Sequence, residues 1–177
     1  MQPDSIPVAN GLSLRRALET DSEFLESLYS STRDDLRQIN AEYCVIEALI
    51  KMQHDLQMQG NAANYPNAHQ WVVEKLGEPL GEPLGEPIGR VIVDFGSNEI
   101  NILSIALIKA VRGNGYGSSV LCGLQQAATK ERLPLVLEVQ HSNPKAKQLY
   151  QKLGFIVEQT DPIADRMVWH SGADFQH

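Results

Sequence analysis

A glycine-rich turn, Arg112-Gly113-Asn114-Gly115-Tyr116-Gly117-Ser118, is the segment of this chain best suited to bind a ligand. It lies between an apolar run, Ile100 to Ile108, that is typical of a strand and a run near Ser119 that is typical of a helix. The first backbone N–H groups of a helix have no intrahelical partner, and the helix dipole adds partial positive charge there. The turn is therefore expected to bind a phosphate or pyrophosphate group.

Two common phosphate-binding motifs do not fit this turn. Gly113 and Gly115 begin a G-x-G pattern, but Ser118 stands where a dinucleotide-binding fingerprint has its third glycine. No Gly-Lys-Ser/Thr follows, so the turn is not a P-loop. Considered alone, the turn is also consistent with a tight connection between a strand and a helix.

A second segment, Asn143 to Phe155, has the pattern N-x-x-A-x-x-x-Y-x-x-x-G-F. Ala146 and Tyr150 are four residues apart and so share one face of a helix that begins near Pro144. Together with the glycine turn, this segment resembles the GNAT superfamily of acyl-CoA-dependent N-acetyltransferases. The resemblance covers about Leu103 to Phe155, and the first sixty residues carry little of it.

The resemblance implies an enzyme that transfers acetyl from acetyl-CoA to a primary amine by direct attack in a ternary complex. The acceptor would be a small-molecule or peptide amine, and a homodimer is possible because dimers are common in similar proteins. Two alternatives stay open. One is a non-catalytic module that binds or senses acyl-CoA, and the other is a transferase of a longer acyl group.

The resemblance also implies which residues bind acetyl-CoA. The strand residues Ile105, Ala106 and Leu107 would offer backbone groups to the pantetheine arm, beside strands that splay apart. The glycine turn would wrap the pyrophosphate, because glycine lets the backbone approach phosphate oxygens closely. Asn143 would contact the cofactor arm, and Ala146 is small where the cofactor passes the helix. The implied cofactor-binding residues are Ile105, Ala106, Leu107, Arg112, Gly113, Asn114, Gly115, Tyr116, Gly117, Ser118, Asn143, Ala146 and Tyr150.

Tyr150 matches the tyrosine usually assigned as general acid in this family. A phenol with a pKa of about 10 is a weaker acid than a thiol, whose pKa is near 8.5, so it protonates the thiolate of coenzyme A only with help from the site. A hydrogen bond from the phenol to the sulfur is the alternative. Glu99, at the start of the apolar strand, is the candidate base for the incoming amine, although no acidic residue lies in the middle of that strand. Ser104 holding a water is a second route, and Glu138 and His141 are weaker candidates.

The apolar patterns predict an α/β (α+β) fold, a mixed and mostly antiparallel sheet of six to seven strands flanked by about four helices, in one domain of residues 1–177. A capping box at Thr20 begins a helix that ends near Ser31, and a second helix covers Glu42 to Gln59, with Gly60 as its stop signal. The expected strands are 12–17, 71–73, 90–95, 100–108, 134–139, 155–157 and 166–169, and the later helices are 115–131 and 144–153.

Between two expected strands, the tetrapeptide Gly-Glu-Pro-Leu occurs twice and is followed by Gly-Glu-Pro-Ile, over residues 77–88. One copy suits a hairpin turn, because Pro fixes φ and Gly relaxes it. We interpret three copies as a turn lengthened by tandem duplication, with a binding loop or dimer contact as the alternative.

The composition favours a cytoplasmic protein without nucleic-acid or membrane partners. The 177 residues carry a formal charge of −7 and no lysine- or arginine-rich run. No apolar run approaches the roughly 18 to 20 residues that cross a bilayer, and the N-terminus lacks a signal-peptide pattern. Cys44 and Cys122 form no C-x-x-C pair and are expected to be reduced thiols, while the scattered histidines predict no catalytic metal.

Overall fold

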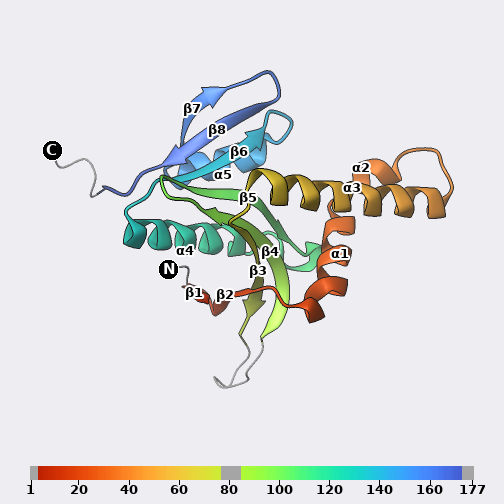
Figure 1. The fold of residues 1–177 in the computed structure, drawn as a ribbon, viewed down its shortest axis with the longest axis horizontal. Helices are drawn as coiled ribbons and strands as arrows, with labels where there is room; N and C mark the ends of the chain where they lie inside the picture. The colour runs from red at the N-terminus through yellow and green to blue at the C-terminus, as the bar shows by residue number, and fades with distance from the viewer. Residues whose placement is uncertain (1–3, 77–84, 173–177) are drawn as a thin grey trace.

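The computed structural model describes residues 4–76 and 85–172, which form one mixed sheet and its covering helices (Figure 1). The strands are β1 (Ser5–Val8), β2 (Leu12–Arg16), β3 (Ala68–Lys75), β4 (Glu86–Phe95), β5 (Ile100–Leu107), β6 (Leu135–Gln140), β7 (Ile156–Thr160) and β8 (Ala164–Trp169). The α-helices are α1 (Ser22–Ser31), α2 (Asp34–Arg37), α3 (Tyr43–Asn64), α4 (Tyr116–Glu131) and α5 (Pro144–Lys152), and short 3₁₀ turns cover Glu19–Asp21 and Lys109–Val111.

The eight strands lie in the order β1-β2-β3-β4-β5-β6-β8-β7, and among these described strands only the β5–β6 pair is parallel. The predicted α+β class with a mostly antiparallel sheet is confirmed, with one strand and one helix more than expected among the described residues. The added strand is β1, which has four residues and pairs with β2 at the edge of the sheet. The added helix is the four-residue α2.

Alternate residues of β4 face different helices, so the sheet is covered on both sides (Figure 1). Val91 and Val93 belong to the main core cluster, which includes the buried α4 residues Val120, Leu121, Leu124 and Ala128. Arg90 and Ile92 instead line cavities beside α1 and α3. A second, smaller cluster of Tyr29, Leu36, Ile46 and Ile50 holds α1, α2 and α3 together.

Both N-terminal helices depart from their predicted ends. Thr20 does not cap α1, because the chain forms a 3₁₀ turn at Glu19–Asp21, where the Asp21 carboxylate accepts a hydrogen bond from the Leu18 N–H at 2.7 Å and pairs with Arg15. Gly60 does not end α3, which continues to Asn64, two residues before Pro66. A glycine inside a helix costs only about 1 kcal/mol relative to alanine, whereas a proline removes a hydrogen bond and clashes with the preceding turn.

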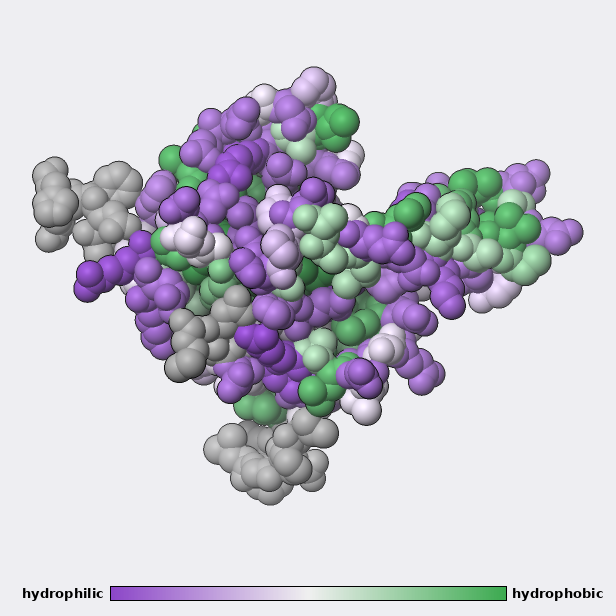
Figure 2. Space-filling view, in the orientation of Figure 1, coloured by the Kyte–Doolittle hydropathy of each residue, from purple (hydrophilic) through white to green (hydrophobic). Residues whose placement is uncertain are grey.

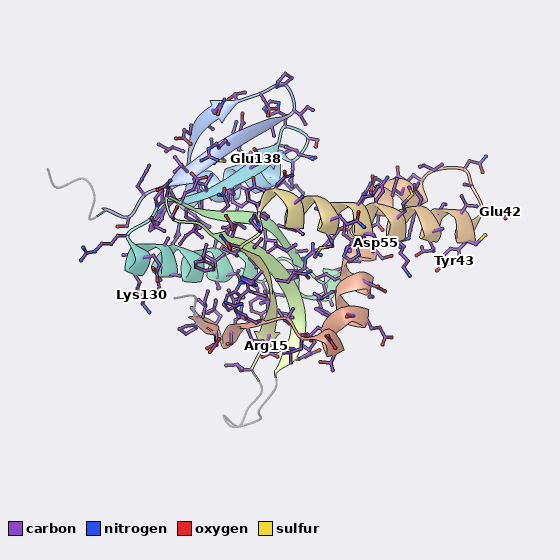
Figure 3. All side chains as sticks on the ribbon, viewed as in Figure 1. Arg15, Glu42, Tyr43, Asp55, Lys130 and Glu138 are labelled. Atoms are coloured by element: carbon purple, nitrogen blue, oxygen red, sulfur yellow. The ribbon has the colours of Figure 1, made fainter. Side chains whose placement is uncertain are left out.

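The first half of α3 extends away from the sheet, with Glu42 and Tyr43 at its far end (Figures 1 and 3). The apolar residues of this helix recur at helical spacing, which predicts a buried stripe, but Val45 is 54% and Leu56 is 58% exposed. Figure 2 shows hydrophobic side chains gathered on this arm. The exposed large hydrophobic residues of α3 are Tyr43, Val45, Met52 and Leu56, and Ile39 is exposed in the connection before it.

β5 and β6 separate after three paired positions, Ile100 with Leu135 to Ile102 with Leu137. Beyond them β5 continues to Leu107 beside β4 alone, and a bulge leaves Leu103 without a partner on β4. A nearly continuous apolar run such as residues 100–108 predicts a strand that is buried on both faces, but from Leu103 onward the strand is only half-buried. The splayed strands that the family resemblance implies are present at this point.

The tandem tetrapeptides connect β3 to β4. Glu86, Pro87 and Ile88 of the third copy belong to β4, where Pro87 lies opposite Glu74 beside a register shift. The first two copies, residues 77–84, lie outside the described residues, so their role stays a prediction.

Candidate active site

A cavity of about 270 Å³ lies where β5 parts from β6 and the glycine turn begins. β5 contributes the segment Ile105-Ala106-Leu107, the turn and α4 contribute Arg112, Gly117 and Leu121, and α5 contributes Leu149 and Tyr150. Thr32, at the end of α1, completes the lining. The structure therefore brings together six of the predicted site residues, Ile105, Ala106, Leu107, Arg112, Gly117 and Tyr150.

The glycine turn holds its backbone open to ligand approach. Gly113 and Gly115 have φ angles of +83° and +79°, the left-handed region that favours glycine, and a Cβ built on either would meet no atom within 4 Å. A Cβ on Gly117 would meet only Leu107 Cδ1, at 4.0 Å. No side chain caps the start of α4, where Gly115 is the N-cap residue. These features fit a diphosphate held by main-chain N–H groups.

The turn is fixed by side chains that bond back to β5 and its extension. Arg112 Nε donates to the Leu107 carbonyl oxygen at 3.1 Å, and Asn114 Nδ2 donates to the Val111 carbonyl oxygen at 2.9 Å. Ser119 Oγ donates to the Gly115 carbonyl oxygen at 3.1 Å and accepts from Asn10 Nδ2 at 2.7 Å. The predicted residues Gly113, Asn114, Gly115, Tyr116 and Ser118 thus flank the cavity without lining it.

Asn143 and Ala146 lie in the first turn of α5, at the end opposite to Tyr150. The Asn143 side chain caps this helix by accepting a hydrogen bond from the Ala146 N–H at 3.3 Å, and Pro144 takes the first helical position. Ala146 packs against the main core. Neither residue lines the cavity, so contact with the cofactor stays a prediction for both.

Tyr150 is positioned by packing rather than by hydrogen bonds. Its ring lies 6.0 Å from that of Phe155, and no hydrogen bond between described residues engages its hydroxyl. Burial raises the pKa of the phenol above its usual value of 10.0. Tyr150 is therefore a protonated donor at neutral pH, with its hydroxyl available to a bound molecule.

Glu99 does not join the other predicted residues. It precedes β5, and at about 3.3 Å per residue it lies roughly 16 Å along the strand from Ser104. Its carboxylate pairs with Arg166 of β8 at 2.5 Å and accepts a hydrogen bond from Asn101 at 3.0 Å. Glu99 lies just before the first residue of β5, whereas the cavity lies at the other end of that strand. The weaker candidate His141 contacts Asp165 at 3.1 Å, and neither it nor Glu138 lines the cavities described here.

A second cavity, of about 690 Å³, adjoins the first and shares Thr32, Ile105 and Ala106 with it. It lies between α1, α2 and α3 on one side and β4, β5 and the end of β6 on the other. Its remaining lining residues are Tyr29, Arg33, Asp34, Asp35, Gln57, Arg90, Ser104, Gln140 and Ser142. The sequence did not predict this cavity. The one available signal was Arg90, a charged residue at the start of the expected apolar strand 90–95.

A model of the acetyltransferase (GNAT) family matches residues 25–155. This chain belongs to the GNAT acetyltransferase family. The family is one of acyltransferases, and acetyl-CoA is its acetyl donor. The match spans the glycine turn, Tyr150 and both cavities, so the recognised family covers the whole candidate site.

Several solved structures share this fold. PaiA N-acetyltransferase from Thermoplasma acidophilum, in complex with coenzyme A, has a TM-score of 0.64 and 17% identity, over 90% of this chain and 99% of its own. An acetyltransferase from Thermus thermophilus has a TM-score of 0.61 and 20% identity, over 93% and 100%. A spermidine N-acetyltransferase from Vibrio cholerae has a TM-score of 0.61 and 19% identity, over 94% and 97%. No curated protein sequence matches this chain.

The described residues, 4–76 and 85–172, also lack two features. None of the helices in these ranges has the length and apolar composition needed to cross a bilayer. Within the same ranges, His, Cys, Asp and Glu side chains form no group of three that could hold a metal ion.

Proposed function

We propose that this protein is an N-acetyltransferase that moves an acetyl group from acetyl-CoA to a primary amine by direct attack in a ternary complex. The observation that carries the proposal is the pair of connected cavities along one strand, β5. The smaller cavity is bordered by the open glycine turn and Tyr150, and the larger opens on the side of α1 and α3. One space suits the thioester arm and the other suits a small-molecule or peptide amine.

The free stretch of β5 supplies the means of holding acetyl-CoA. From Ser104 to Leu107 the strand pairs with β4 on one side, and no described strand pairs with it on the side of β6. Backbone groups of this stretch are therefore available to the amides of the pantetheine arm, except for the Leu107 carbonyl, which accepts from Arg112. The diphosphate then reaches the turn, where Gly113, Gly115 and Gly117 let the N–H groups approach phosphate oxygens. Arg112 lies beside both and adds a positive charge.

Tyr150 stabilises the departing thiolate in this scheme. When a neutral amine attacks the thioester carbonyl, the carbon–sulfur bond breaks and negative charge develops on sulfur. The phenol has a pKa above 10, whereas a thiol has one near 8.5, so complete proton transfer is uphill by more than about 2 kcal/mol. Tyr150 therefore donates a hydrogen bond to sulfur, and the thiolate takes its proton from solvent.

The acceptor amine is proposed to lose its protons to water rather than to a dedicated carboxylate. Asp34 and Asp35 are the carboxylates that line the larger cavity, and both are already in ion pairs, with Lys109 and with Arg33 respectively. Ser104 and Gln140 provide polar lining that can order a water chain. The distance of Glu99 from Ser104 argues against Glu99 as the direct base.

A coenzyme A release assay with a panel of amines tests the proposal, alongside calorimetry with acetyl-CoA. We expect heat on titration, thermal protection and amine-dependent release of free thiol. Absence of both heat and thermal protection would contradict the proposal. Binding without turnover on any amine would favour the non-catalytic module, and tighter binding or faster turnover of longer acyl-CoA esters would favour transfer of a longer acyl group.

A further inference from the structure

Arg90 is a buried cation whose charge has no partner among the described residues. Its side chain rises from β4 into the larger cavity, and the residue is only 3% exposed. Nη2 donates to Ser104 Oγ at 3.0 Å, and Nε is buried without a hydrogen-bond partner. No carboxylate of the described residues forms an ion pair with it. A buried charge in this state is costly unless something binds to it.

The neighbours of Arg90 do not compensate its charge. The other cations near the cavity are matched, Arg33 by Asp35, Lys109 by Asp34, and Arg37 by Asp34 and Glu47. Burial lowers the pKa of His54, and the nearby guanidinium of Arg90 lowers it further, so the imidazole is neutral at pH 7. The Tyr29 hydroxyl accepts from Arg33 at 3.1 Å. Arg90 is left as an unmatched positive charge in a cavity that a ligand can enter.

The position of Arg90 relates it directly to the proposed reaction. It lies opposite Ala106 in the β4–β5 pair, and opposite residues of an antiparallel pair project to the same face about 5 Å apart. Ala106 lines both cavities, and it belongs to the strand proposed to hold the thioester arm. A small molecule whose anionic group is bound by Arg90 can therefore place its amine next to the carbonyl carbon of the thioester.

We infer that the amine acceptor carries a carboxylate and that Arg90 binds this carboxylate, so that the acceptor is an amino acid or a similarly compact amino-carboxylate. The inference rests on the proposed function and names the acceptor class of the same site. A guanidinium binds a carboxylate through two parallel hydrogen bonds, which would use donors that Arg90 leaves free. An acceptor that carries only positive charge, such as a polyamine, would instead place its ammonium groups against an unmatched cation.

The test compares the twenty common amino acids with their amides and their decarboxylated amines in the coenzyme A release assay, with spermidine included. We expect at least one amino acid to have a kcat/KM tenfold or more above that of its amide and its decarboxylated amine. In the Arg90→Gln variant this preference should fall below threefold while the Kd for acetyl-CoA stays unchanged. Arg37→Gln is the matched control, because Arg37 is exposed and paired and does not line the cavity; it should keep the preference.

Thermal shift with coenzyme A present gives a second readout that does not need turnover. The preferred amino acid should raise Tm in the native protein and not in Arg90→Gln. If that variant does not fold, Arg90→Lys is used, which keeps the charge and loses the paired hydrogen bonds. The inference is overturned if amides, decarboxylated amines or spermidine match the acids, if Arg90→Gln keeps the preference, or if no amino acid gives either turnover or a Tm shift. Failure of acetyl-CoA to bind at all would instead contradict the proposed function.

Discussion

Gly117→Ala is expected to stabilise the free protein and to weaken its binding of acetyl-CoA. A packing defect alone would not raise stability and lower affinity at the same time. Gly117 is the second residue of α4, and a Cβ there would meet only Leu107 Cδ1 at an ordinary contact distance of 4.0 Å. Alanine is favoured over glycine in a helix by up to about 1 kcal/mol. For a chain of this size that free energy corresponds to a rise in Tm of roughly 2–4 °C.

The same methyl group would stand at the wall of the smaller cavity, which Gly117 helps to line. If it prevents one main-chain N–H from reaching a phosphate oxygen, the loss is that of one hydrogen bond to a charged group, about 1.5–3 kcal/mol. Since 1.4 kcal/mol is a factor of ten, the Kd for acetyl-CoA should rise about 10- to 150-fold. Thermal unfolding of the free protein and calorimetry with acetyl-CoA measure the two effects.

Gly60→Ala is the control for this experiment. Gly60 lies inside α3 and a Cβ there would meet nothing within 4 Å, so the variant should gain similar stability with no change in affinity. An unchanged Kd in Gly117→Ala would refute the proposal that the backbone at this position approaches the cofactor. A loss of stability would refute the description of Gly117 as an unstrained helical residue.

Three further variants probe the turn, the phenol and the distant carboxylate. Gly115→Ala should lower the free energy of unfolding by about 1–2 kcal/mol, because alanine must adopt a φ of +79°, and denaturant unfolding measures this; unchanged stability would contradict the left-handed conformation. Tyr150→Phe should lower kcat about tenfold or more with little change in the KM for acetyl-CoA, and an equal rise in KM would contradict a role limited to the thiolate. The native rate should fall only above pH 10, because burial raises the pKa of Tyr150 and activity needs its protonated form, and this fall should be absent from Tyr150→Phe. Glu99→Gln should leave the pH profile of kcat/KM unchanged and cost less than about 1 kcal/mol, since its pair with Arg166 is one-third exposed; a shifted acidic limb would restore Glu99 as the base.

The fold was predictable where the apolar pattern is long and regular. The run from Val120 to Ala128 has helical spacing and is buried as a helix, and residues 90–95 and 100–107 form strands as expected. β1 was not predicted, because four residues that include Pro7 give too short a pattern. The end of α3 was misplaced because Gly60 is tolerated inside a helix that buries Ile46 and Ile50 elsewhere along its length.

The candidate site was likewise predictable only in part. The turn from Arg112 to Ser118 and the helix that carries Tyr150 are local motifs, so their resemblance to the GNAT superfamily was enough to name their residues. The larger cavity draws on residues from Tyr29 to Ser142 on six different elements, and no local pattern records that they meet. Glu99 was misjudged for the same reason: the sequence places it at the start of β5, and no local pattern records that the cavity lies at the other end of that strand.

The early separation of β5 from β6 divides the sheet into two parts, β1 to β5 and β6 with β8 and β7. In the described residues these parts are joined at only three paired positions. The pantetheine arm of the acyl donor, lying between these two parts, would act as a substitute strand. Its amides would make the hydrogen bonds that β6 does not make with β5. It would also shield main-chain groups that otherwise form an open edge, the part of a sheet most prone to pair with another chain. Saturation with the acyl donor would therefore protect this protein against self-association as well as heat.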